Sequence, residues 1–123
     1  MENEDLLWAA VPFMGGIAGQ QAAPCGAVSA AAVFLGLKFR CSIADEEKAK
    51  DARNKSRAEA HELVKRFTEA FGTITCDHLL GIDLSIPSEA KRFGNSGRFK
   101  ETCDKFVPWV VDLLYEFEER KPS

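Results

Sequence analysis

The chain has 123 residues, of which 46% are hydrophobic, and a formal net charge of −3. This length and composition predict one folded chain with a sizeable core and exclude an intrinsically disordered protein. The slight acidity argues against a nucleic-acid partner, because domains that bind nucleic acid are usually basic. The longest apolar stretch, around residues 27–37, is too short and too rich in alanine to span a membrane. The N-terminus begins with acidic residues instead of a basic leader, so we expect a cytoplasmic protein.

The N-terminal part of the sequence predicts two helices separated by a glycine-rich loop. Asn3 is suited to cap the first helix, which Pro12 should end or kink. Residues 14–24, MGGIAGQQAAP, are typical of a loop, because their three glycines permit positive φ angles. A second helix is predicted over residues 24–36, with a proline at its first turn and a glycine near its end. A strand over AAVFLGL is the alternative, but the high alanine content disfavours it.

The rest of the sequence predicts three more helices. The longest should begin at a cap, Ser42 or Asp45, and end at Gly72. A short helix is predicted within residues 75–81, and residues 82–99 are predicted to form a loop. The last helix begins near residue 103 and carries the strongest amphipathic pattern of the chain. The sequence therefore predicts an all-α protein, a single compact domain of four to five helices over residues 1–123.

The four cysteines are the residues best suited to redox or metal chemistry. The N-terminus disfavours structural disulfides of a secreted protein, and no C-x-x-C pair indicates a zinc ribbon or a thioredoxin-type site. Cys25, Cys76 and Cys103 lie at or just before predicted helix starts. The N–H groups and partial positive charge there favour a thiolate, which attacks disulfides and binds metals. Cys41 instead lies in a predicted loop between helices, and burial as small apolar residues is the alternative for all four.

Two stretches of the sequence resemble a known protein family. They are FMGGIAGQQAAPCGAVSAAAVFLGLK, residues 13–38, and LVKRFTEAFGTITCDHLLGIDL, residues 63–84. Together with a later cysteine that opens the final helix, they resemble the C_GCAxxG_C_C family of redox-active proteins. Members of this family are small, helical, cysteine-bearing proteins of bacteria and archaea. The resemblance covers roughly residues 5–115.

The resemblance implies a site made of cysteines, which either binds an iron–sulfur cluster or carries out thiol redox chemistry. Cys25 matches the cysteine of the family motif C-G-A-x-x-G, Cys76 matches that of C-x-x-L-L-G, and Cys103 matches the last one. Ala30 stands where the first motif has its final glycine. Family members usually carry a further cysteine before the glycine-rich stretch, and this sequence has none there. Three of the four family cysteines are therefore matched.

Three functions follow as alternatives. The first is a metal or iron–sulfur centre held by Cys25, Cys76 and Cys103, with Cys41, His78 or a residue of a partner chain as the fourth ligand. The second is metal-free thiol–disulfide exchange, in which Cys25 attacks and Cys76 or Cys103 resolves. The third is a helical oligomerisation module without redox activity. We expect an electron-transfer partner of unknown identity in the redox cases. The apolar residues 6–14 should form an exposed surface suited to a homodimer.

Overall fold

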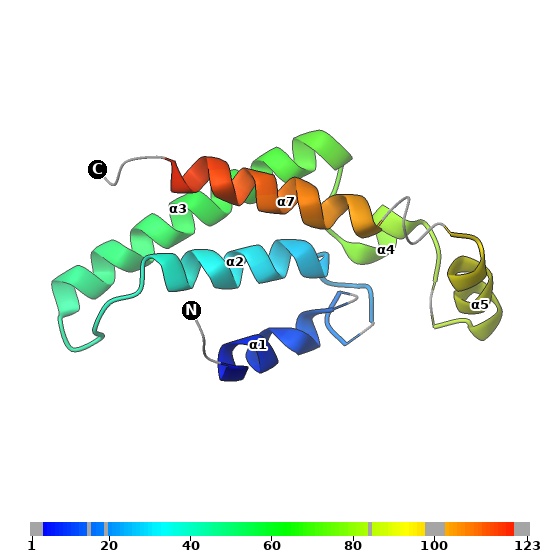
Figure 1. The fold of residues 1–123 in the computed structure, drawn as a ribbon, viewed down its shortest axis with the longest axis horizontal. Helices are drawn as coiled ribbons and strands as arrows, with labels where there is room; N and C mark the ends of the chain where they lie inside the picture. The colour runs from blue at the N-terminus through cyan, green and yellow to red at the C-terminus, as the bar shows by residue number, and fades with distance from the viewer. Residues whose placement is uncertain (1–3, 15, 19, 84, 98–102, 120–123) are drawn as a thin grey trace.

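The protein is built from helices, as the sequence predicts (Figure 1). The computed structural model describes residues 4–119 apart from residues 15, 19, 84 and 98–102. Within these residues there is no β-strand, and no helix is long and apolar enough to cross a membrane. The elements are α1 (Glu4–Ala10), the 3₁₀ helix η1 (Val11–Phe13), α2 (Gly26–Lys38), α3 (Glu46–Phe71), α4 (Cys76–Leu80), α5 (Pro87–Asn95) and α7 (Cys103–Glu118).

The ends of the central helices follow from local sequence signals. Asp45 caps α3, because its carboxylate accepts a hydrogen bond from the Lys48 amide at 3.1 Å. Gly72 and Gly81 end α3 and α4 in the left-handed conformation, with φ angles of 86° and 69°. The second helix begins two residues later than predicted, with Cys25 as its N-cap residue. The cap signals therefore set these boundaries to within about two residues.

The prediction of a loop over residues 82–99 is wrong, because α5 occupies much of it. Pro87 opens the helix, where its missing N–H leaves no hydrogen bond unmade. The Glu89 carboxylate in the first turn accepts a hydrogen bond from the amide of Asp83 at 3.0 Å. Phe93 is the one side chain of this helix that is fully buried. The proline, serine, glycine and asparagine of this segment are typical of a loop and masked the helical spacing of Ile86, Ala90 and Phe93, which explains why the helix escaped prediction.

Three helices enclose the main core. In Figure 1, α2, α3 and α7 run along the long axis of the molecule, and α2 packs against both of the others. Phe67 of α3 lies at the centre, with its ring 4.8–5.6 Å from those of Phe71, Phe106 and Trp109. The buried residues of this core are Val28, Ala31, Leu35, Leu63, Phe67, Phe106, Val110, Leu113 and Phe117.

An ion pair joins the same three helices at the end of α2. Lys38, its last residue, donates to both carboxylate oxygens of Glu59 on α3, at 2.9 and 3.0 Å. The same ammonium donates to the carbonyl of Phe117 on α7 at 3.2 Å. Both charged side chains are largely shielded from solvent, so the pair fixes how this end of the bundle packs. Cys25, Cys76 and Cys103 lie toward the opposite end, where α2 begins.

Candidate functional site

The site is organised by an antiparallel contact between two segments that lie far apart in the sequence. Pro24 and Thr75 form an isolated β-bridge. The amide of Cys25 donates to the carbonyl of the residue before Thr75 at 2.6 Å. The amide of Cys76 donates to the carbonyl of the residue before Pro24 at 3.1 Å. The bridge therefore holds the start of α2 beside the start of α4.

This bridge places two cysteines on the same side of the backbone. Successive side chains of an extended segment point to opposite sides, and Cys25 and Cys76 each follow a bridge residue directly. They are diagonal neighbours across the bridge, a relation that puts Cα atoms about 7–8 Å apart. A disulfide requires Cα atoms within about 7 Å. Closure of a disulfide between Cys25 and Cys76 therefore requires the two segments to move closer together.

The glycine-rich loop closes around this pair. Gly16 has a φ angle of 67°, and a Cβ atom built on it would lie 2.9 Å from the Cβ of Cys76 and 2.7 Å from the Cα of Gln21. A Cβ on Gly26 would lie 3.3 Å from the Cα of Met14. Both glycines are therefore points of close backbone approach, as the sequence suggests for this loop. The loop therefore lies in close contact with Cys76 and with the first turn of α2.

Cys76 is the most enclosed of the four thiols, with only 8% of the residue exposed. Burial raises the pKa of the Cys76 thiol above its usual value, because a thiolate is costly to desolvate. The neighbouring Cys25, Cys103 and Asp77 raise this pKa further, since each adds negative charge nearby. A hydrogen bond with the Gln21 side chain acts in the opposite direction. Cys76 is therefore held as a protonated thiol at neutral pH.

Cys103 completes a group of three thiols. It packs against the small buried cluster of Cys76, Leu80 and Phe93, and Cys25 packs against the main core. Both residues are half-buried, so solvent reaches them more easily than Cys76. Figure 1 shows that α2 and α7 begin at the end of the molecule where α4 lies. The prediction that three cysteines lie at helix starts is confirmed, and the fold brings those starts together.

The chain was compared with models of known protein families. A family model described as "Putative redox-active protein (C_GCAxxG_C_C)" matches residues 1–117. The chain belongs to the C_GCAxxG_C_C family. No curated protein and no solved structure matches it. The resemblance read from the two motifs is thus confirmed over nearly the whole chain, together with the general redox character of the family.

Two further residues, Cys41 and His78, were candidates for the fourth ligand in this C_GCAxxG_C_C protein. Cys41 is exposed and lies beyond the last residue of α2. The 13 residues of α2 span about 20 Å, so Cys41 and Cys25 lie at opposite ends of this helix. The His78 ring is 73% exposed, and its Nδ1 lies 2.6 Å from the hydroxyl of Thr75. The role of His78 as a fourth metal ligand stays a prediction.

The three thiols of the C_GCAxxG_C_C protein are of a chemical type that binds metals. Their arrangement, however, does not form a metal site. Cysteine thiolates are the usual ligands of iron–sulfur clusters. Among the residues that the structure describes, however, no three histidine, cysteine, aspartate or glutamate side chains lie together as a group that could hold a metal ion. The three thiols are close enough to influence one another, but as placed they do not form a metal cage.

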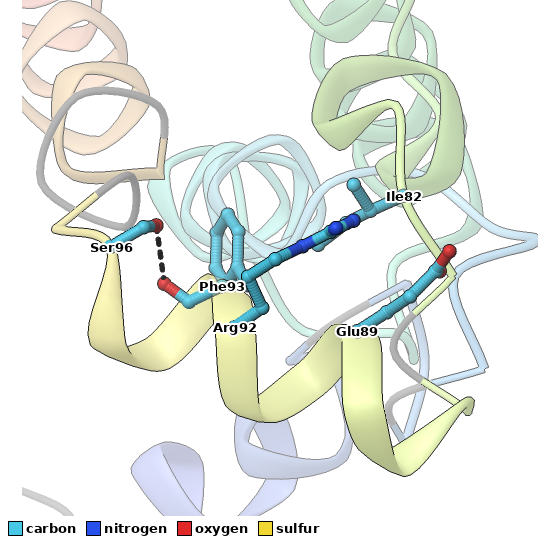
Figure 2. Close-up of a pocket in the computed structure, with 5 residues that line it drawn as sticks. All are labelled: Ile82, Glu89, Arg92, Phe93 and Ser96. Atoms are coloured by element: carbon cyan, nitrogen blue, oxygen red, sulfur yellow. Dashed lines mark hydrogen bonds between the residues drawn. The ribbon is translucent and has the colours of Figure 1, made fainter.

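A surface hollow lies beside the cysteine cluster of this family member. Ile82, Glu89, Arg92, Phe93 and Ser96 line it, and all but Ile82 belong to α5 or follow it directly (Figure 2). Phe93 and Ile82 also pack in the cluster that contains Cys76 and Cys103. In Figure 2 the side chain of Arg92 extends toward Ile82. α5, which the sequence did not predict, therefore contributes Phe93 to the cluster that contains Cys76 and Cys103.

Sequence reasoning also missed Gln21 in the C_GCAxxG_C_C protein. It is 4% exposed, which makes it the one buried polar residue among those described. It lies in a loop that attracted attention for its glycines alone, and a glutamine in such a loop is usually solvated. No periodic or motif signal marks it, because its importance comes from contacts with residues about sixty positions away.

Proposed function

We propose that this member of the redox-active family is a dithiol–disulfide protein whose redox pair is Cys25 and Cys76. One observation supports the proposal: the Pro24–Thr75 bridge makes Cys25 and Cys76 diagonal neighbours across two paired segments. The influence of Cys25 on the pKa of Cys76 supports their proximity independently. Loop and helix contacts hold both residues, so little conformational entropy opposes closure of the bond.

The proposed reaction exchanges the protein dithiol for a disulfide of a partner molecule. The Cys25 thiolate attacks one sulfur of the partner disulfide, forms a mixed disulfide and releases the other partner sulfur as a thiolate, which takes up a proton. Cys76 then loses its proton and attacks the sulfur of Cys25, releasing the second partner thiol. Two electrons and two protons pass from the protein to the partner in total. The reverse sequence oxidises a partner dithiol.

The different environments of the three thiols suggest their order of action. Cys25 is half-buried at the N-cap position of α2, so a partner disulfide can reach it more readily than it can reach Cys76. Cys76 is enclosed and protonated, which suits a resolving thiol that acts after a mixed disulfide has formed beside it. Cys103 is half-buried in the same cluster and is the alternative partner of Cys76. This alternative gives a different product, so experiment can separate the two.

A redox titration with thiol counting tests the proposal. The reduced protein is equilibrated with mixtures of a small dithiol and its cyclic disulfide, and free thiols are then counted by alkylation and mass measurement. Four thiols per chain should fall to two in a single two-electron transition, within the chain and without dimer formation. A count that stays at four across the whole range of potentials would refute the proposal.

The iron–sulfur centre expected from the family resemblance is the second candidate. Three thiols gathered at one end of the bundle supply soft donors of the correct type. The thiols would have to approach one another more closely than they do here, and a fourth ligand would have to join them. Anaerobic purification followed by iron and sulfide analysis decides between the candidates. Stoichiometric iron and sulfide would favour the cluster, and their absence after attempted reconstitution would exclude it.

The expected homodimer and electron-transfer partner belong to this proposal as well. Trp8, Val11 and Met14 are exposed, at 70%, 53% and 75%, and they provide the apolar surface that was expected near the N-terminus. Light scattering measures whether two chains associate through it. A cytoplasmic location, where thiols are kept reduced, is the setting that suits a dithiol of this kind.

A further inference from the structure

Two opposite charges of α5 line the same surface hollow without pairing. Glu89 lies in the first turn of this helix and Arg92 in its last turn. They are three residues apart, a spacing at which acidic and basic side chains of a helix are neighbours. Both residues are described by the structure and line the hollow, yet no ion pair joins them. Each charge is therefore available to a molecule that enters the hollow.

The two side chains are directed by different contacts. The Oε2 atom of Glu89 accepts a hydrogen bond from the amide of Asp83 at 3.0 Å, which leaves Oε1 as a further acceptor. The side chain of Arg92 extends toward Ile82 (Figure 2). Within the part of the chain that the structure describes, the guanidinium of Arg92 has no hydrogen-bond or ion-pair partner. Its N–H donors can therefore bind an anionic group of a ligand.

Apolar side chains form the rest of the hollow and connect it to the thiols. Its volume of about 170 Å³ is several times that of one water molecule, so it can hold a group of small-molecule size. Ile82 and Phe93 line it, and both also pack in the cluster that contains Cys76 and Cys103. A molecule bound in the hollow would thus contact the same two side chains that pack beside these thiols.

We propose that this hollow binds the α-amino-acid group of a small disulfide, which is the partner molecule of the dithiol. An α-amino-acid group carries a carboxylate and an ammonium on one carbon atom. The planar guanidinium of Arg92 matches a carboxylate with two parallel hydrogen bonds, and the carboxylate of Glu89 accepts from the ammonium. Ile82 and Phe93 contact the methylene group next to the sulfur. The inference rests on the proposed dithiol function and names the class of its substrate.

Binding of a probe that cannot exchange thiols tests the hollow by itself. S-methylcysteine carries the amino-acid group, and its sulfur is an unreactive thioether. Titrated into the reduced, ¹⁵N-labelled chain, it should cause saturable shifts in the amide signals of Ile82 and α5. Arg92→Gln keeps a polar side chain and removes the charge, so it should weaken this binding about tenfold or more. Circular dichroism establishes that the variant is folded.

Lys91→Gln is the matched control. Lys91 is the exposed neighbour of Arg92 on α5 and does not line the hollow, and the substitution removes the same charge. It should bind S-methylcysteine as tightly as the unmodified chain does. Glu89→Gln is the second variant, because its amide oxygen can still accept from the Asp83 amide. It should weaken binding of S-methylcysteine but not of 3-(methylthio)propionate, which has a carboxylate and no ammonium.

A kinetic experiment identifies the source of the amino-acid group. The reduced protein is mixed with increasing concentrations of cystine, of glutathione disulfide or of hydroxyethyl disulfide, which has no charged group. Arg92→Gln should raise the concentration for half-maximal rate about tenfold with the disulfide that the hollow binds. It should leave the rate with hydroxyethyl disulfide unchanged. A larger effect with cystine identifies a free amino acid, and a larger effect with glutathione disulfide identifies a peptide; either supports the proposal.

The binding and redox results are separable. No saturable shift with S-methylcysteine, or equal affinities of Arg92→Gln and Lys91→Gln for it, would overturn the inference whatever thiol counting gives. Saturable binding that Arg92→Gln weakens, in a chain whose four thiols do not oxidise, would support the hollow and refute the dithiol function alone. Weakened binding together with an intact two-electron transition supports both proposals.

Discussion

The Cys76→Ser variant should be unable to complete the transfer of two electrons to a disulfide. Serine occupies nearly the same space as cysteine and keeps the backbone hydrogen bonds around the Pro24–Thr75 bridge. The Cys25 thiolate can still attack a small disulfide, but no thiol at position 76 resolves the mixed disulfide that results. Attack from within the chain is replaced by attack from solution, so we expect release of the second thiol to slow by roughly a hundredfold or more.

Mass measurement of the stalled adduct checks this result. Reduced Cys76→Ser protein treated with a small glutathione-type disulfide should accumulate one covalent adduct, on the peptide of residues 1–38, which contains Cys25. Cys41→Ser is the matched control, since Cys41 is exposed and lies at the other end of α2. It should resolve the mixed disulfide at Cys25 as fast as the unmodified chain. Equal rates for Cys76→Ser and Cys41→Ser would contradict the role given to Cys76.

Gly16→Ala should strongly destabilise the loop that encloses Cys76. Its φ angle of 67° costs alanine about 1–2 kcal/mol. The added carbon would also lie within 2.9 Å of a backbone oxygen of Ala23 and of the Cβ of Cys76, and such overpacking costs about 1–3 kcal/mol more. Urea denaturation should show a lower free energy of unfolding by the sum of these terms.

Gly36→Ala provides the contrast for this prediction. Gly36 lies inside α2, and a Cβ atom there would meet no other atom within 4 Å. Alanine is the better helix former, so this variant should gain about 0.5–1 kcal/mol in free energy of unfolding. Equal stability of the two variants would show that the loop does not press on Cys76 as described. A loss confined to Gly16→Ala would support the close approach.

Local sequence signals were sufficient for every long helix except α5, and for the position of Cys25, Cys76 and Cys103 at helix starts. Asp45, Gly72 and Gly81 are cap residues whose effect depends only on their immediate neighbours, and they mark helix ends correctly. Phe106, Val110, Leu113 and Phe117 fall on the buried face that their spacing predicts. These features depend on interactions within a few residues, so a single sequence is enough to find them.

The arrangement of the site depends on contacts that no local signal encodes. The Pro24–Thr75 bridge joins segments about fifty residues apart, and neither segment has the alternating pattern of a strand. The sequence therefore predicted three thiols at helix starts without indicating which two share one side of the backbone. Gln21 was missed for the same reason, because its partners Ile82 and Cys76 come from a distant part of the chain.

α5 shows a second limit of sequence reasoning. Its segment contains proline, serine, glycine and asparagine, which are typical of loops. The helix instead depends on Phe93, whose burial beside Cys76 and Leu80 is a tertiary contact. Tertiary packing here outweighs weak local preference, as it often does for short helices. The same helix carries Arg92 and Glu89, which line the surface hollow beside Phe93.

Mapping of the disulfide in the oxidised protein shows directly whether Cys25 and Cys76 form the redox pair. Trypsin divides the four cysteines among the peptides 1–38, 41–48, 67–91 and 101–105. After mild oxidation of the dilute protein, alkylation of the remaining free thiols and tryptic digestion without reductant, peptides 1–38 and 67–91 should be joined through Cys25 and Cys76. Peptides 41–48 and 101–105 should each carry an alkylated cysteine. Recovery of peptide 67–91 joined to 101–105, or of four unlinked peptides, would contradict the assignment of Cys25 and Cys76 as the redox pair.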